Sequence, residues 1–164
     1  RLQFAREIVE KYRPTVIKGN ISECKSFYGL TSHAHGFDAA SDYQEYVYQS
    51  VTWLKELALH TGCIVVCSGK MDIITDGEQA VIIRNGCEMM GVVTGTGCML
   101  NVAIATFLAS FEPFEACLKA TCYYEVAAEK TKANGPGTFH MHFMDEIYQL
   151  TEEDEAFFNT EVVR

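Results

Sequence analysis

The chain has 164 residues, a length that fits one domain with a substantial core, and 48% of them are hydrophobic. Its formal net charge is −9 and it contains no basic run, so nucleic acid is not expected as a partner. The longest apolar run, from Val102 to Phe111, is too short and too interrupted for a membrane span, and the N-terminus lacks the shape of a signal peptide. We therefore expect a cytoplasmic protein that has no membrane partner.

The first third of the chain predicts helices around one strand. Apolar residues at helical spacing predict a helix from Leu2 to Tyr12, which Pro14 ends. This helix starts without a capping residue, which suggests a fragment or a separated half of something longer. After it we expect, in order, a strand over Thr15–Ile17, a helix opened by Ser22 and Glu23 and closed at Gly29, a polar loop over Thr31–Asp42 and a helix over Tyr43–His60.

The middle of the chain predicts buried strands. The unbroken apolar run from Cys63 to Cys67 is typical of a strand covered on both faces. The segments 72–75 and 79–84 flank Asp76-Gly77, which predicts a hairpin, and Asn85-Gly86 predicts a second turn. Further on we expect a helix from Pro113 to about Lys130, a last helix over Thr138–Leu150, and a loose end or docking segment over Thr151–Arg164. Helices alternating with buried strands predict one α/β layered domain.

The segment Thr94-Gly95-Thr96-Gly97-Cys98 is the candidate centre of the chemistry. We expect residues 89–93 to form a strand or extended approach and residues 98–110 to form a buried helix. A helix that begins near Gly97 points its first main-chain N–H groups at whatever lies above it, and this arrangement binds anions. The alternative is a plain strand-to-helix turn. No lysine follows these glycines as in a P-loop, and Leu100 stands where the dinucleotide fingerprint needs its third glycine.

The cysteines and histidines argue against disulfides and zinc. The seven cysteines are odd in number, contain no C-x-x-C pair and mostly lie in apolar runs, so free buried thiols in a reducing compartment are expected. The pairs His33/His35 and His140/His142 are two residues apart, which does not put both rings on one helical face.

Several motifs occur in one order along the chain. They are Lys18-Gly19-Asn20-Ile21-Ser22-Glu23, then Ser68-Gly69-x-x-Asp72 with Thr75-Asp76-Gly77, then Asn85-Gly86, and finally Thr94-Gly95-Thr96-Gly97-Cys98-Met99-Leu100. This ordered set, over residues 1 to about 150, resembles hydroxyethylthiazole kinase, a ribokinase-like enzyme of thiamine salvage. The resemblance implies a layered fold with helices on both faces of a mostly parallel sheet, of which this chain is the C-terminal part.

The resemblance also implies an activity and its cofactors. The expected reaction is ATP-dependent, Mg²⁺-assisted phosphorylation of the hydroxyl of 4-methyl-5-(2-hydroxyethyl)thiazole, in a homotrimer with active sites between subunits. In the family, an N-terminal section supplies much of the thiazole pocket and an Asp-Pro-Val-Gly segment whose aspartate helps hold the metal. That section does not occur in this chain, and we expect it to be required for activity.

The first motif and the second carry metal and ATP roles by resemblance. The family's N-x-x-E pattern falls on Asn20 and Glu23, which implies that Asn20 binds ATP and that Glu23 holds Mg²⁺ directly or through water. The alternative for Glu23 is a capping residue in the first helical turn. Lys18 stands where the family has an arginine on the ATP phosphates, and Ser68 matches a Ser/Thr contact to ATP. The alternatives are a solvated lysine and a turn serine.

The glycine-rich motif carries the substrate and catalytic roles. By the resemblance, Gly95 matches a position that borders the thiazole, Thr96 would contact ATP, and Gly97 and Cys98 would take part in catalysis. We expect the main-chain donors of residues 95–98 to contribute most by holding the phosphoryl group, while Cys98 orients the hydroxyl and takes its proton late. Three alternatives stay open: Cys98 as a covalent nucleophile in acyl or thiol transfer, a non-catalytic truncated kinase module, and another ribokinase-fold kinase that acts on a different hydroxymethyl heterocycle.

Overall fold

The structure, a computed structural model, describes residues 2–30 and 40–163. His33, His35 and most of the loop predicted over Thr31–Asp42 lie outside these residues. The last part of that predicted loop is helical, because the next helix begins at Ala40 and not at Tyr43.

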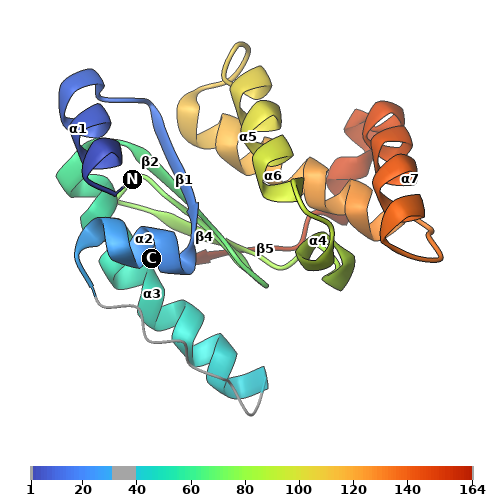
Figure 1. Ribbon diagram of the computed structural model, residues 1–164, viewed down its shortest axis with the longest axis horizontal. Helices are drawn as coiled ribbons and strands as arrows, with labels where there is room; N and C mark the ends of the chain where they lie inside the picture. Colours follow the sequence, from blue (N-terminus) through green and yellow to red (C-terminus); the bar gives the residue numbers. More distant parts are fainter. Residues whose placement is uncertain (1, 31–39, 164) are drawn as a thin grey trace. The chain divides into compact units, whose positions relative to one another are not determined.

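The chain divides into two compact units, which we describe one at a time. The first unit comprises residues 1–82 and 162–164, and the second comprises residues 83–161. In the order of the chain (Figure 1), the elements that fall mainly in the first unit are α1 (Leu2–Tyr12), β1 (Val16–Asn20), α2 (Ile21–Tyr28), α3 (Ala40–Thr61), β2 (Ile64–Ser68), β3 (Asp72–Thr75) and β4 (Ala80–Ile83). The remaining elements are α4 (Glu88–Val92), α5 (Thr96–Phe107), α6 (Pro113–Lys130), α7 (Pro136–Gln149), the 3₁₀ helix η1 (Glu152–Phe157) and β5 (Thr160–Val163).

The strands form one five-stranded sheet in the order β1-β2-β3-β4-β5. Strands β1 and β2 are parallel, and Asn20 at the end of β1 pairs with Ser68 at the end of β2. Strand β3 runs antiparallel to β2, with Val66 opposite Ile74. The predicted α/β class is confirmed, and the sheet within this chain is mixed: its parallel pair is joined by the α2–α3 crossover that parallel strands require.

The core of the first unit is built on one face of this sheet. Cys24 of α2 and the buried side of α3 (Val47, Val51, Leu54, Leu57 and Ala58) share a cluster with Val65, Cys67, Ile73 and Ile82. The alternate strand residues, such as Val66 and Ile74, are also fully buried. This confirms the prediction that the strand near Cys63–Cys67 is covered on both sides.

The β3–β4 connection forms the predicted hairpin at Asp76-Gly77. The Thr75 hydroxyl accepts from the Gly77 amide (3.0 Å) and donates to the Gln79 carbonyl (2.6 Å). Gly77 has a φ of 100°, and an added Cβ would lie 2.6 Å from Cγ of Leu59. Both the left-handed backbone and the close approach of α3 therefore require glycine here.

Helix α6 is the centre of the second unit, and α5, α7 and η1 pack against it. Pro113 stands at its first turn, as predicted, and the helix ends at Lys130. Its buried Tyr124 meets Phe143 of α7 edge to face with ring centroids 4.8 Å apart, and Phe143 stacks on Phe139. The helices of this unit are thus held by aromatic packing around α6.

One expectation for the second unit was wrong. The segment before the glycine-rich motif is the short helix α4, in which the Val93 amide donates to the Met89 carbonyl (3.0 Å). Its Glu-Met-Met sequence favours helix, and a short apolar run does not by its spacing separate a strand from a helical turn.

Of the two alternatives for the segment after Leu150, the structure argues against a loose end, because residues 152–157 form η1 and residues 160–163 form β5 at the edge of the sheet. The Asp154 carboxylate accepts from Nζ of Lys130 (2.6 Å) and from the Thr151 amide (2.8 Å). These two donors hold the pKa of Asp154 below its ordinary value. No helix within residues 2–30 and 40–163 is long and apolar enough to cross a bilayer.

Candidate functional site

In the first unit, the predicted ATP and metal residues lie at the carboxyl ends of β1 and β2. Because the two strands are parallel and Asn20 pairs with Ser68, these two residues lie side by side at the carboxyl-terminal end of the sheet. The Ser68 hydroxyl donates to the Gly19 carbonyl across the pair (3.4 Å). Open α/β sheets bind ligands outside the carboxyl ends of their parallel strands. The structure thus brings Asn20, Glu23 and Ser68 to the end of the sheet where such a ligand is expected.

Asn20 and Glu23 form a reciprocal capping box at the start of α2. The main-chain N–H of Glu23 donates to Oδ1 of Asn20 (2.9 Å), and the main-chain N–H of Asn20 donates to Oε2 of Glu23 (2.7 Å). A Cβ added to Gly19 would lie 3.2 Å from Cβ and 3.3 Å from Oε2 of Glu23. The capping alternative for Glu23 is therefore confirmed, and its carboxylate is held against the end of β1 at an exposed position. The metal role of Glu23 stays a prediction.

Lys18 lies on β1, half-buried, opposite Val66. Its charge lowers the pKa of the Cys67 thiol, but a hydrogen bond with Cys24, burial and the negative charges of Cys24 and Asp72 outweigh it and hold that pKa well above its ordinary value. The phosphate contact assigned to Lys18 stays a prediction.

In the second unit, the glycine-rich motif forms the start of α5. Gly95 is the residue before the helix and has a φ of 101°, so it stands in the left-handed region that favours glycine. The first turn closes when the Met99 amide donates to the Gly95 carbonyl (2.9 Å). The amides of residues 96–98 precede the i→i−4 ladder, as the first amides of any helix do. Gly97 and Cys98 are exposed, so this helix start is open on the surface of the unit.

The Thr96 side chain serves the fold of the second unit. Its hydroxyl is nearly buried and donates to the Met90 carbonyl (2.8 Å), which ties α5 to α4. Its carbonyl accepts from the hydroxyl of the buried Tyr124 (2.8 Å), whose pKa burial raises. An ATP contact by Thr96 would fall to its main-chain amide. Sequence reasoning missed Tyr124, because a tyrosine inside an apolar helix gives no sign of where its hydroxyl bonds.

The cysteines are all free, as expected. Five of them are buried, Cys87 is half-buried and Cys98 is exposed at the start of α5. Within the described ranges of the chain, no group of three or more His, Cys, Asp or Glu residues is arranged to hold a metal ion.

Asn85 is a structural residue that the sequence marked only as a turn. Its side-chain amide donates to Oε2 of Glu129 (3.1 Å) and to the Phe157 carbonyl (3.0 Å). Its carbonyl oxygen accepts from the Asn159 amide (2.7 Å). The turn that leads toward the glycine-rich motif is therefore fastened to both α6 and the segment before β5.

The sequence model of the hydroxyethylthiazole kinase family matches residues 1–153. The chain belongs to the hydroxyethylthiazole kinase family. This confirms the resemblance seen in the motifs.

Individual relatives support the same assignment. Hydroxyethylthiazole kinase 2 of Clostridium botulinum strain Langeland is 35% identical over 157 residues, which cover 93% of this chain and 59% of the relative. Hydroxyethylthiazole kinase of Thermoanaerobacter sp. strain X514 is also 35% identical, with the same coverage. The chain therefore spans about three-fifths of the length of these hydroxyethylthiazole kinases.

Solved structures support the ribokinase-like fold. The hydroxyethylthiazole kinase protein of Pyrococcus horikoshii OT3 superposes with a TM-score of 0.85 at 27% identity, covering 99% of this chain and 60% of that one. The pyridoxal kinase of Staphylococcus aureus in complex with ADP superposes with a TM-score of 0.60 at 16% identity, covering 99% of this chain and 57% of that one. At that identity the likeness to pyridoxal kinase concerns the fold alone.

Proposed function

We propose that this chain is the phosphoryl-transfer part of a hydroxyethylthiazole kinase, which phosphorylates the hydroxyl of 4-methyl-5-(2-hydroxyethyl)thiazole with ATP. Membership of the family supports the reaction class, and the exposed start of α5 after Gly95 is the observation that carries the mechanism. The complete kinase would also need the N-terminal section that the family resemblance assigns to the thiazole pocket. We propose a cytoplasmic homotrimer as the working assembly.

The start of α5 would hold the transferring phosphoryl group. Its first-turn amides point along the helix axis toward the surface, and the helix dipole adds about half a positive charge there. A protein with a net charge of −9 needs such a local site to attract phosphate. One main-chain donor aimed at developing negative charge contributes roughly 10²–10³ in rate. Gly97 serves this role because no side chain stands between its amide and the phosphoryl oxygens.

Cys98 would orient the attacking hydroxyl and accept its proton late in the reaction. Cys98 stands in the first turn of α5, where its side chain is exposed beside the first main-chain amides. Since phosphoryl transfer has a loose transition state, a strong base is not required. Gly95, which precedes the helix, would border the thiazole ring.

The donors at the end of β1 fit Mg²⁺. Magnesium takes oxygen ligands, retains several waters and uses one or two carboxylates beside substrate phosphates. Glu23 offers an exposed carboxylate whose Oε2 is fixed by the Asn20 amide, so the side chain is oriented before any ligand binds. When bound, Mg²⁺ neutralises phosphate charge. Asn20, Ser68, Lys18 and the Thr96 amide would contact the ATP.

A chimera tests the proposed activity. The N-terminal section of the Thermoanaerobacter kinase is fused ahead of Arg1, and ADP release is measured with and without the thiazole alcohol. We expect thiazole-dependent ADP formation by the chimera and Mg²⁺-dependent ATP binding by the chain alone. If neither protein binds ATP, the proposal is wrong.

The substitution Glu23→Gln separates the metal role from the capping role. Glutamine keeps an oxygen that accepts from the Asn20 amide, so α2 should stay folded with a loss below about 1 kcal/mol. We expect the Mg²⁺ concentration needed for half-maximal activity of the chimera to rise about tenfold or more. An unchanged Mg²⁺ requirement would leave Glu23 as a cap alone.

A further inference from the structure

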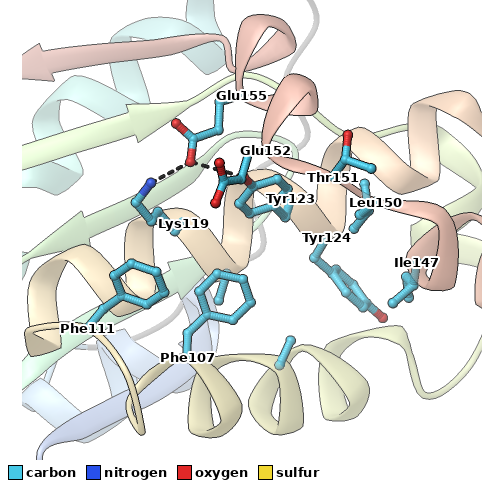
Figure 2. Close-up of a pocket in the computed structure, with 12 residues that line it drawn as sticks. Phe107, Phe111, Lys119, Tyr123, Tyr124, Ile147, Leu150, Thr151, Glu152 and Glu155 are labelled. Atoms are coloured by element: carbon cyan, nitrogen blue, oxygen red, sulfur yellow. Dashed lines mark hydrogen bonds and ion pairs between the residues drawn. The ribbon is translucent and has the colours of Figure 1, made fainter.

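A cavity of about 730 Å³ lies within the second unit, and Figure 2 shows its lining. Its walls come from the later part of α5 and the segment after it, the middle of α6, the end of α7 and η1. None of residues 95–98 lines it. Its size is in the range of pockets that bind small organic molecules, which is roughly 300–1,000 Å³.

One wall of the cavity is aromatic. Phe107 and Phe111 stack with ring centroids 5.6 Å apart, and Tyr123 tilts against Phe107 at 5.8 Å. Such a wall offers flat, polarisable faces to a flat ligand. The face of Phe111 already attracts a cation, because Nζ of Lys119 lies 5.5 Å from its ring centroid.

The rim of the cavity is negative on balance. The Lys119 ammonium forms an ion pair with Glu155, and the Tyr123 hydroxyl donates to the same Glu155 oxygen (3.0 Å). These two donors lower the pKa of Glu155, so it is charged at neutral pH. Glu152 adds a second carboxylate on the same side of the cavity (Figure 2). The lining therefore has one positive and two negative side chains, and because Lys119 and Glu155 pair with each other, its net charge of −1 lies on the side of Glu152.

We propose that this cavity binds a flat aromatic organic cation, with its ring system against Phe107 and its charge toward Glu152. An anion of the same shape would meet the Glu152 carboxylate, and the single ammonium of the lining is held by Glu155. A neutral ring would gain the burial but neither the cation–π attraction nor the carboxylate. Charge thus separates ligands that the apolar walls alone would bind equally.

Three quinoline probes test the charge preference on the full chain by equilibrium dialysis at about pH 8: N-methylquinolinium as the cation, quinoline as the neutral analogue and quinaldate as the anion. We expect the cation to bind about tenfold more tightly than quinoline, and quinaldate to bind most weakly. Added salt should weaken the binding of the cation and leave the binding of quinoline nearly unchanged.

Neighbouring glutamates supply the matched control. Glu152→Gln should weaken N-methylquinolinium binding about threefold, whereas Glu153→Gln, an exposed neighbour on η1 that does not line the cavity, should leave it unchanged. Phe107→Leu keeps apolar bulk but removes a π face, so it should weaken the binding of N-methylquinolinium about fivefold and that of quinoline much less. If Phe107→Leu fails to fold, the two glutamate variants still decide.

The proposal is overturned if N-methylquinolinium binds no more tightly than quinoline, or if Glu153→Gln matches Glu152→Gln. It is also overturned if the cation shows no saturable binding because a second copy of the chain fills the cavity. Sedimentation of the chain with and without the probe identifies that occupant.

Discussion

The side chain of Asn85 provides the sharpest test of how the second unit is held together. It is 6% exposed and makes three hydrogen bonds: two as a donor, to Glu129 and the Phe157 carbonyl, and one as an acceptor, from the Asn159 amide. Each net hydrogen bond is worth about 1 kcal/mol, and a buried group left without a partner costs roughly 1–3 kcal/mol. Asn85→Ala should therefore destabilise the second unit by about 2–3 kcal/mol.

Asn85→Asp has the same shape but replaces the donor with an acceptor. The new carboxylate keeps the bond from the Asn159 amide and faces the Glu129 carboxylate at the present 3.1 Å contact. Two unit charges at that distance repel by about 5 kcal/mol at an effective dielectric constant of about 20. After local relaxation we expect a loss of about 3–5 kcal/mol at neutral pH, more than for Asn85→Ala.

The pH dependence distinguishes the two substitutions. Repulsion from Glu129 should raise the folded-state pKa of the new carboxyl above its unfolded value of about 3.9. Protonation then favours the folded state, so Asn85→Asp should regain about 2 kcal/mol relative to Asn85→Ala as the pH falls through that raised pKa. A protonated carboxyl can again donate a hydrogen bond.

Urea unfolding by far-UV circular dichroism measures these losses, and amide hydrogen exchange over residues 155–161 localises them to the second unit. Fluorescence of Trp53, on α3 of the first unit, reports whether the other unit is unaffected. A loss below about 0.5 kcal/mol for Asn85→Ala would refute this account of the turn. Equal losses for both substitutions at every pH would refute the assigned donor roles.

Three further substitutions test the site and the C-terminal segment. Gly95→Ala should cost about 1–2 kcal/mol and weaken ATP binding severalfold, because the φ of Gly95 is 101°, which disfavours any residue with a side chain. Gly91→Ala is the control: Gly91 also has open space around it but no positive φ, so its substitution should be neutral or stabilising. Equal unfolding midpoints for the two variants would contradict this. Cys98→Ala in the chimera should lower kcat by less than about 10⁴, the upper range of general-base catalysis, and steady-state kinetics showing a greater loss would make Cys98 an essential base. Asp154→Asn should lower the free energy of unfolding by about 1–2 kcal/mol at pH 7. Because the Lys130 contact lowers the folded-state pKa of Asp154, this difference from the unsubstituted chain should shrink as the pH falls below about 4. A difference that stays constant with pH in urea titrations would argue against the ion pair.

Local sequence signals determined most of the elements. Pro113 and the residues near Lys130 define α6, the spacing from Leu2 to Tyr12 defines α1, and Asp76-Gly77 defines a hairpin, because helix starts, apolar spacing and left-handed turns depend on a few adjacent residues. The ordered motifs through Cys98 also determined the family, since each motif serves a main-chain geometry that only a few residue types allow.

Tertiary structure decided what depends on distant partners. Strand β5 exists because the edge of the sheet and the bonds to Asn85 and Lys130 hold an acidic segment that has no pattern of its own. That the Thr96 carbonyl accepts from the Tyr124 hydroxyl likewise depended on groups that meet only after folding. A sequence specifies its periodicity and turns locally, whereas a side chain's hydrogen-bond partner is selected by whichever buried groups the packed elements bring to it.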